Sequence, residues 1–161
     1  MLRTPLADRF QLIVHTESRE APMYALVVAR NDGRLGPELR KASIDCEAVQ
    51  VARTPAADAN LCQSEVGGAI LGRGQRTSAL ARSLSLFTDR PVEDRSGLNG
   101  GFDFELRFPE LNTHPNAAGP RSDPSSDIFT ALQEQLGLKL ESIRGNLEFI
   151  VIDKVAHPTE N

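Results

Sequence analysis

Residues 128–155 read IFTALQEQLGLKLESIRGNLEFIVIDKV, and the change of periodicity inside this stretch decides the fold class. Its first part carries apolar side chains at every fourth position, which predicts a helix with one apolar stripe and an end at Gly137. The stripe residues are Ile128, Leu132 and Leu136. An alternating segment at 138–141 and an apolar run at 147–155 then predict two strands, joined by a turn at 144–146.

Two earlier stretches repeat this order of elements. Each predicts a helix followed by two strands: residues 2–10, 12–15 and 23–29 in the first stretch, and 77–87, 91–93 and 102–108 in the second. We therefore expect an α+β fold of repeated helix–β-hairpin (αββ) units, with the helices packed on small, mainly antiparallel sheets. We expect the whole chain, residues 1–161, to form one domain.

Composition excludes several classes of partner. The formal net charge of −4 and the pI of about 5.4 argue against nucleic acid binding. The longest apolar runs are the length of a strand, so we expect no transmembrane segment in this chain. The apolar stripe that begins at Leu2 predicts that an N-terminal portion precedes Met1, and the first residues of this chain lack the apolar region of an export signal.

The two cysteines carry information about the compartment. Cys46 and Cys62 lie in a stretch with turn residues and little periodicity, and two thiols are too few for a structural zinc site. We expect a disulfide between them, which would place the protein outside the cytoplasm. The alternative is a pair of free thiols in a cytosolic protein.

Two irregular segments lie between the predicted elements, one between the second and third units and one within the second. Residues 109–123 hold three prolines and several polar residues, which predicts a Pro-rich flexible linker within the domain. The next helix should begin at Pro124, because proline suits the first helical position. Residues 94–101 predict a tight loop, in which Asp94 accepts hydrogen bonds from nearby backbone N–H groups.

No motif in the chain indicates a reaction. The histidines lack the spacing of metal ligands, and no serine stands in a G-x-S-x-G elbow. Residues 72–77 resemble a phosphate-binding turn but lack the Lys-Ser/Thr end of a P-loop, and Thr77 is better explained as a helix N-cap. The residues considered were His15, His114, His157, Ser78, Ser83, Ser96 and Ser125.

Three aspartates are candidates for a cation site. Asp89, Asp94 and Asp103 could converge near the tight loop, but calcium requires six to eight oxygen ligands. The sequence therefore predicts no catalytic, cofactor-binding or metal-ligating residues and no cofactor.

Six segments resemble the soil-associated proteins, an uncharacterised family found chiefly in Acidobacteria. They are Leu6–Phe10, Pro22–Val28, Asp89–Leu98, Ile128–Ser142, Val151–Val155 and Pro158–Asn161. The resemblance implies an exported domain, sometimes attached to a membrane metallopeptidase of the antibiotic-sensor type, and it implies no established activity. A weaker likeness connects the helix-to-strand step at 131–138 with the short N-terminal domains of secretins and TonB-dependent receptors.

These observations favour a non-catalytic extracytoplasmic interaction or sensor domain of unknown ligand, periplasmic or secreted. Its partner would be a protein or another component of the cell envelope, which could add to an exposed sheet edge. One alternative is an accessory hydrolase whose site the missing N-terminal portion completes. The other is a structural module of the cell envelope.

Overall fold

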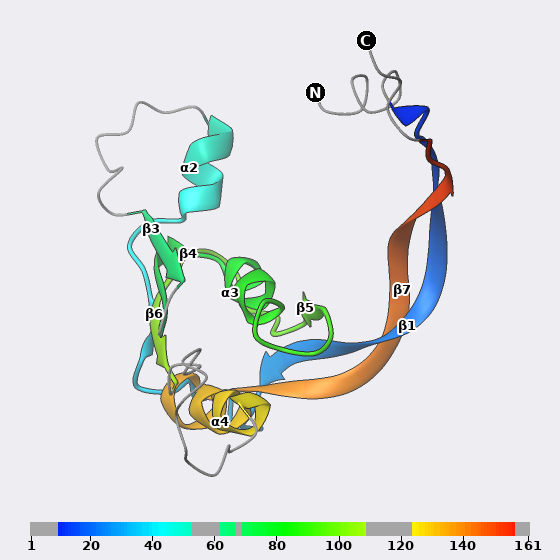
Figure 1. Ribbon diagram of the computed structural model, residues 1–161. Helices are drawn as coiled ribbons and strands as arrows, with labels where there is room; N and C mark the ends of the chain where they lie inside the picture. The colour runs from blue at the N-terminus through cyan, green and yellow to red at the C-terminus, as the bar shows by residue number, and fades with distance from the viewer. Residues whose placement is uncertain (1–9, 53–61, 67–68, 109–123, 157–161) are drawn as a thin grey trace, which may run out of the picture. The chain divides into compact units, whose positions relative to one another are not determined.

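The computed structural model describes residues 10–52, 62–66, 69–108 and 124–156 (Figure 1). Contacts within the chain divide it into two units, which we describe separately. The ribbon unit comprises Met1–Pro22 and Arg144–Asn161, and the core unit comprises Met23–Ile143.

A four-stranded antiparallel sheet forms one layer of the core unit. Its strands follow the order β2-β6-β4-β3. Their bounds are Leu39–Lys41 for β2, Gln63–Val66 for β3, Ala69–Gln75 for β4 and Phe102–Arg107 for β6. Strict alternation along β6 buries Phe102, Phe104 and Leu106 on one face, whereas Arg107 on the other face is exposed. The sheet therefore has one face in the core and one open face.

The described part of the core unit also contains three α-helices and one π-helical turn. They are α2 (Cys46–Ala52), α3 (Thr77–Leu84), α4 (Pro124–Ala131) and the π-helical η2 (Leu132–Leu136). The predicted stripe of Ile128, Leu132 and Leu136 is buried, and the predicted start at Pro124 is confirmed. Gly137 ends η2 in the left-handed conformation, with a φ of +67°, which confirms the predicted helix end.

One hydrophobic cluster holds these elements together. Fourteen buried residues form it, and burial of a large aliphatic side chain contributes roughly 1.5–3 kcal/mol. They are Leu26, Leu39, Ile70, Leu80, Ala81, Leu84, Phe102, Phe104, Leu106, Ile128, Ala131, Leu132, Leu136 and Leu138. All of them belong to the core unit.

The second sheet has three strands in the order β5-β1-β7. The strands are β1 (Ile13–Val28), β5 (Val92–Asp94) and β7 (Leu138–Lys154), and β1 pairs with β5 in parallel. Backbone bonds join Ala29 N to Gly137 O (2.9 Å) and Ala156 N to Phe10 O (2.7 Å), so β1 and β7 are antiparallel. In the ribbon unit the outer parts of β1 and β7 form a two-stranded ribbon.

The α+β class and its largely antiparallel sheets are confirmed, but the repeat of αββ units is not. The strands predicted at 12–15 and 23–29 belong to the single strand β1, and β7 continues through the turn predicted at 144–146. In the middle unit β5 pairs with β1, whereas β6 pairs with β2 and β4. The strands of the predicted units therefore pair with strands from elsewhere in the sequence, because burial of β6 and pairing of β1 with β7 decide their partners.

Several smaller predictions can also be compared with the structure. Residue 76, not Thr77, occupies the N-cap of α3. The predicted linker at 109–123 and most of the helix at 2–10 lie outside the described residues, and the single domain over 1–161 stays a prediction.

Candidate functional site

The ribbon unit exposes large apolar side chains. Five of its residues are 38% to 68% exposed: Ile13, Phe149, Ile150, Ile152 and Val155. None of its described residues is buried. A two-stranded ribbon alone is marginally stable in water and needs a third strand or a packed face. Contiguous exposed apolar side chains of this kind are typical of interaction surfaces.

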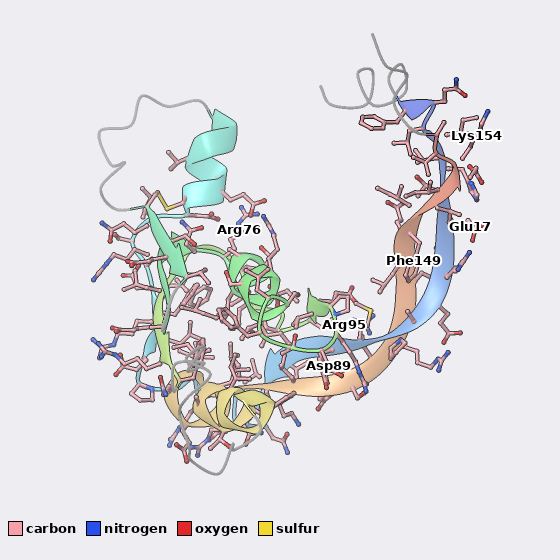
Figure 2. The ribbon with its side chains drawn as sticks, in the orientation of Figure 1. Glu17, Arg76, Asp89, Arg95, Phe149 and Lys154 are labelled. Atoms are coloured by element: carbon pink, nitrogen blue, oxygen red, sulfur yellow. A yellow bond between two sulfur atoms is a disulfide. The ribbon has the colours of Figure 1, made fainter. Side chains whose placement is uncertain are left out.

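Alternation along β7 divides its outer part into two faces. One face carries Glu148, Ile150, Ile152 and Lys154, and the other carries Leu147, Phe149, Val151 and Asp153. Figure 2 labels Phe149 and Lys154 on this strand. The first face thus places two exposed isoleucines between an acidic and a basic residue, and we call it the outer β7 face.

A polar cluster joins β1 to β7 within the ribbon unit. His15 Nδ1 lies 2.8 Å from Asp153 Oδ2 and its Nε2 lies 2.9 Å from Glu17 Oε1, while Arg19 Nε donates to Glu17 Oε2 at 2.6 Å. The hydrogen bond to Asp153, followed by that to Glu17, raises the pKa of His15 above 6.5. The hydrogen bond from His15, followed by that from Arg19, lowers the pKa of Glu17 below 4.5.

These pKa directions give the cluster a pH dependence. The raised pKa of His15 means that its stabilising contribution is complete below pH 6.5 and is lost as the pH rises through the folded-state pKa. The lowered pKa of Glu17 means that its contribution is present above pH 4.5 and is lost on acidification. The cluster therefore joins the two strands best between about pH 4.5 and 6.5.

An NMR titration of the His15 imidazole tests this assignment. We expect a midpoint above 6.5 in the unmodified protein and a midpoint closer to 6.5 in Asp153→Asn, because the neutral amide no longer stabilises the imidazolium. Asp32→Asn is the matched control, since Asp32 bonds to Arg30 and Arg34 in the core unit. A midpoint that does not change in Asp153→Asn would contradict the contact.

The open face of the four-stranded sheet has a hollow of about 270 Å³. Its lining residues are Glu38, Arg40, Leu71, Gly72, Arg73, Asp103, Phe104 and Glu105. Charges of both signs surround it, and several are already engaged: Arg40 donates to the Pro37 carbonyl (3.1 Å), and Asp103 accepts the Gly74 N–H (2.8 Å). No hydroxyl, thiol, imidazole or amine lines this hollow, so it offers a charged binding surface rather than a nucleophile.

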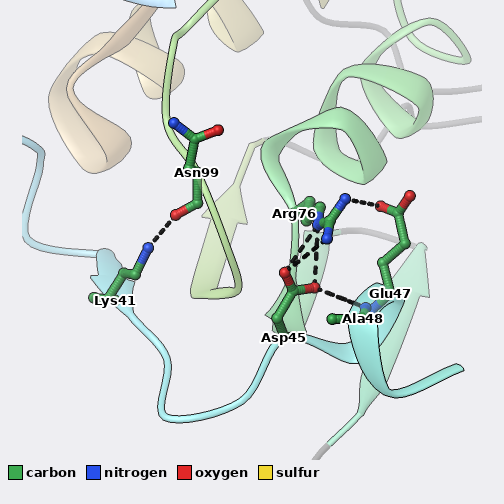
Figure 3. A network of polar contacts seen from close by, with 6 residues as sticks. All are labelled: Lys41, Asp45, Glu47, Ala48, Arg76 and Asn99. Atoms are coloured by element: carbon green, nitrogen blue, oxygen red, sulfur yellow. Dashed lines mark hydrogen bonds and ion pairs between the residues drawn. The ribbon is translucent and has the colours of Figure 1, made fainter. Parts of the chain in front are cut away.

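An ionic junction joins the starts of α2 and α3 (Figure 3). Arg76 Nε lies 3.1 and 3.0 Å from the two Asp45 oxygens, and its Nη1 lies 3.3 Å from Glu47. Asp45 also caps α2 by accepting the N–H groups of Glu47 and Ala48 at 3.1 and 3.2 Å. The hydrogen bond from Arg76 lowers the pKa of Asp45 and raises that of the guanidinium. All of these charges pair with each other, which indicates a structural role.

The disulfide lies beside this junction. Cys46 at the start of α2 is bonded to Cys62, with 5.8 Å between their Cα atoms. Cys62 immediately precedes β3, so the bond joins a helix to the edge of the four-stranded sheet.

The tight loop after β5 holds a hydroxyl–carboxylate network. Thr77 Oγ1 donates to Asp94 Oδ2 (2.6 Å), and Ser96 Oγ donates to Asp94 Oδ1 (2.7 Å). The Ser96 N–H bonds to the same oxygen at 3.0 Å, which confirms the predicted turn at Asp94. Neither hydroxyl contacts a histidine in the part of the chain that the structure describes, so the network fixes the loop to α3 without forming a nucleophile–base pair.

The three aspartates considered for a cation have separate partners. Asp89 accepts from Tyr24 Oη (3.1 Å), Asp94 bonds to Thr77, and Asp103 bonds to Gly74. Across residues 10–52, 62–66, 69–108 and 124–156, no three His, Cys, Asp or Glu side chains are placed to hold a metal. A search of the same residues finds no helix that is both long and apolar enough to cross a membrane.

Residues 1–155 match the family described as protein of unknown function, DUF3738. The chain belongs to this family. At that level the match agrees with the resemblance to an uncharacterised domain. No curated protein and no solved structure matches this member of the DUF3738 family.

Sequence reasoning missed the outer β7 face. The apolar run at 147–155 is typical of a buried strand, and its exposure became visible only in the structure. One sequence feature does point to this face. Glu148 and Lys154 each stand three residues from Val151 in the sequence, and an isoleucine lies between Val151 and each of them.

Proposed function

We propose that this member of the DUF3738 family is a non-catalytic, extracytoplasmic interaction domain that binds a protein partner through the ribbon unit. The observation that carries the proposal is that the ribbon unit exposes five large apolar side chains and has no buried residue among those described. Four of the five lie on β1 and β7, and Val155 directly follows β7. Folded proteins rarely leave such groups in water unless a partner covers them. Unpaired backbone groups along an edge strand add a directional element to that binding.

Two observations support a location outside the cytoplasm. The bond between Cys46 and Cys62 is of the kind that persists in oxidising compartments, whereas cytosolic thiols are kept reduced. The resemblance to exported soil-associated proteins points the same way. A periplasmic or secreted domain fits both observations.

Photo-crosslinking in the cells that make the protein tests the surface. With p-benzoylphenylalanine in place of Ile150, we expect a covalent protein adduct, because this side chain is 68% exposed on the proposed surface. Leu86 is the matched control: it is 72% exposed but belongs to the core unit. Equal adduct yields at the two positions, or none at position 150, would overturn the proposal.

A further inference from the structure

We infer that the partner of the ribbon unit is a second copy of this chain, with the two β7 strands paired antiparallel about a two-fold axis through Val151. The inference rests on the proposed function and names its partner. It follows from the free edge of β7, from the symmetry of its charges and from its exposed isoleucines.

The edge of β7 is available for pairing. In the three-stranded sheet β7 is the end strand, and β1 is its neighbour among the described strands. The strand has 17 residues, and its outer part, from Arg144 to Lys154, belongs to the ribbon unit. An edge of this length presents a row of unpaired N–H and C=O groups, which a second strand can satisfy.

Symmetry restricts how two copies can pair. Residues directly opposite in antiparallel strands share a face, so a two-fold axis perpendicular to the sheet must pass through a residue rather than between two. With the axis at Val151, Glu148 lies opposite Lys154 of the second copy, and Ile150 lies opposite Ile152 of the second copy. The symmetry repeats each pair, giving two ion pairs and two isoleucine pairs on one face.

Neighbouring registers lack this match. An axis through Ile150 places Glu148 opposite Ile152 of the second copy. An axis through Ile152 places Lys154 opposite Ile150 of the second copy. Both oppose a charge to an apolar side chain on the outer β7 face. The axis at Val151 does so only on the other face, where Phe149 lies opposite Asp153 of the second copy and Asp153 is already bonded to His15 at 2.8 Å. On the outer β7 face, the axis at Val151 is therefore the register that pairs opposite charges.

The charges and the apolar groups needed for this pairing are free within the described residues. Glu148 and Lys154 are both exposed, and neither side chain has an ion-pair or hydrogen-bond partner in the part of the chain that the structure describes. By contrast, the nearby charges of Arg144 and Glu20 bond to each other at 2.9 Å. Ile150 and Ile152 are 68% and 61% exposed. Pairing would convert two marginal two-stranded ribbons into one four-stranded sheet.

Light scattering with purified protein tests the mass. We expect twice 17.6 kDa for the unmodified chain. Glu148→Lys and Lys154→Glu should each weaken the dimer about tenfold, since each places like charges opposite one another twice. Mixing these two variants should restore the dimer, because in the mixed pair every charge again faces its opposite. Rescue by mixing also shows that each variant folds.

A cysteine on the axis tests the register. Val151→Cys should oxidise to a covalent dimer, because opposite Cα atoms in antiparallel strands lie about 4.5–5.5 Å apart, within disulfide range. Asn146→Cys is the matched control: it stands five residues from the axis, so its two copies are far apart. Equal dimer yields from both variants would overturn the register.

The outcomes separate this inference from the proposed function. A monomeric mass, or a dimer that Glu148→Lys leaves unchanged, overturns the β7 pairing. If the adduct at position 150 is then a different protein, the ribbon remains an interaction surface and only its partner changes. If position 150 gives no adduct and the mass is monomeric, both proposals are overturned.

Discussion

Gly137→Ala is expected to lower the free energy of unfolding by about 2–4 kcal/mol, because this glycine meets two separate requirements. Its φ of +67° lies in the left-handed region, which costs an alanine roughly 1–2 kcal/mol. A Cβ atom there would also lie 2.5 Å from the backbone nitrogen of Gly36 and 2.9 Å from the carbonyl carbon of Leu35. Backbone atoms cannot rotate away, so the loop must move.

The loop is held there by the end of η2. Gly36 N–H bonds to the Leu136 carbonyl at 2.8 Å, and Glu38 N–H bonds to the Gln135 carbonyl at 2.9 Å. These bonds satisfy carbonyl groups that a helix end otherwise leaves without partners. Displacing the loop therefore costs hydrogen bonds as well as packing. We expect the melting temperature to fall by roughly 5–15 °C in a thermal melt followed by circular dichroism.

Gly97→Ala is the matched control for Gly137→Ala. Gly97 has nearly the same φ, +71°, but no heavy atom lies within 4 Å of the position its Cβ would take. Gly97→Ala should therefore lower the free energy of unfolding by only about 1 kcal/mol, the cost of the left-handed backbone conformation. Equal losses in the two variants would show that the approach of residues 35–36 contributes nothing.

Local patterns predicted the helices better than the pairing of the strands. The stripe of Ile128, Leu132 and Leu136 and the stop at Gly137 depend only on neighbouring residues, and both were confirmed. The partners of β1 and β7 depend on contacts over more than a hundred residues, such as Arg144 to Glu20 at a separation of 124. Hairpin pairing is the usual expectation for consecutive strands, and it does not describe how β1, β5, β6 and β7 pair.

The turn predicted at 144–146 shows why the expected hairpin does not form. Arg, Gly and Asn together are typical of a turn, but a glycine is also tolerated inside a strand that has a continuous partner. Pairing with β1 supplies that partner, and β7 runs straight through. The same pairing leaves Ile150 and Ile152 exposed to solvent. An apolar run of this kind is typical of a buried strand, so hydrophobicity alone could not predict the candidate site.

Removing both cysteines, as Cys46→Ser with Cys62→Ser, is expected to cost about 3 kcal/mol of unfolding free energy. The bond closes a loop with a sequence separation of 16, and opening it returns conformational freedom to the unfolded chain. For a chain of this size, the melting temperature should fall by roughly 6–12 °C. Replacing both residues avoids leaving a lone thiol that could react elsewhere.

A reductant and a nearby variant complete this experiment. Reduction should lower the melting temperature of the unmodified protein by a similar amount and leave the double variant unchanged. Denatured, unreduced protein should show no free thiol, and reduced protein should show both of its cysteines, since the described structure has none free. Asp45→Asn, which weakens the adjacent junction with Arg76 and keeps the disulfide, should cost about 1 kcal/mol, because that pair is partly exposed to solvent. Two free thiols in the unreduced protein would show that the disulfide is absent. The main physical support for a location outside the cytoplasm would then be lost.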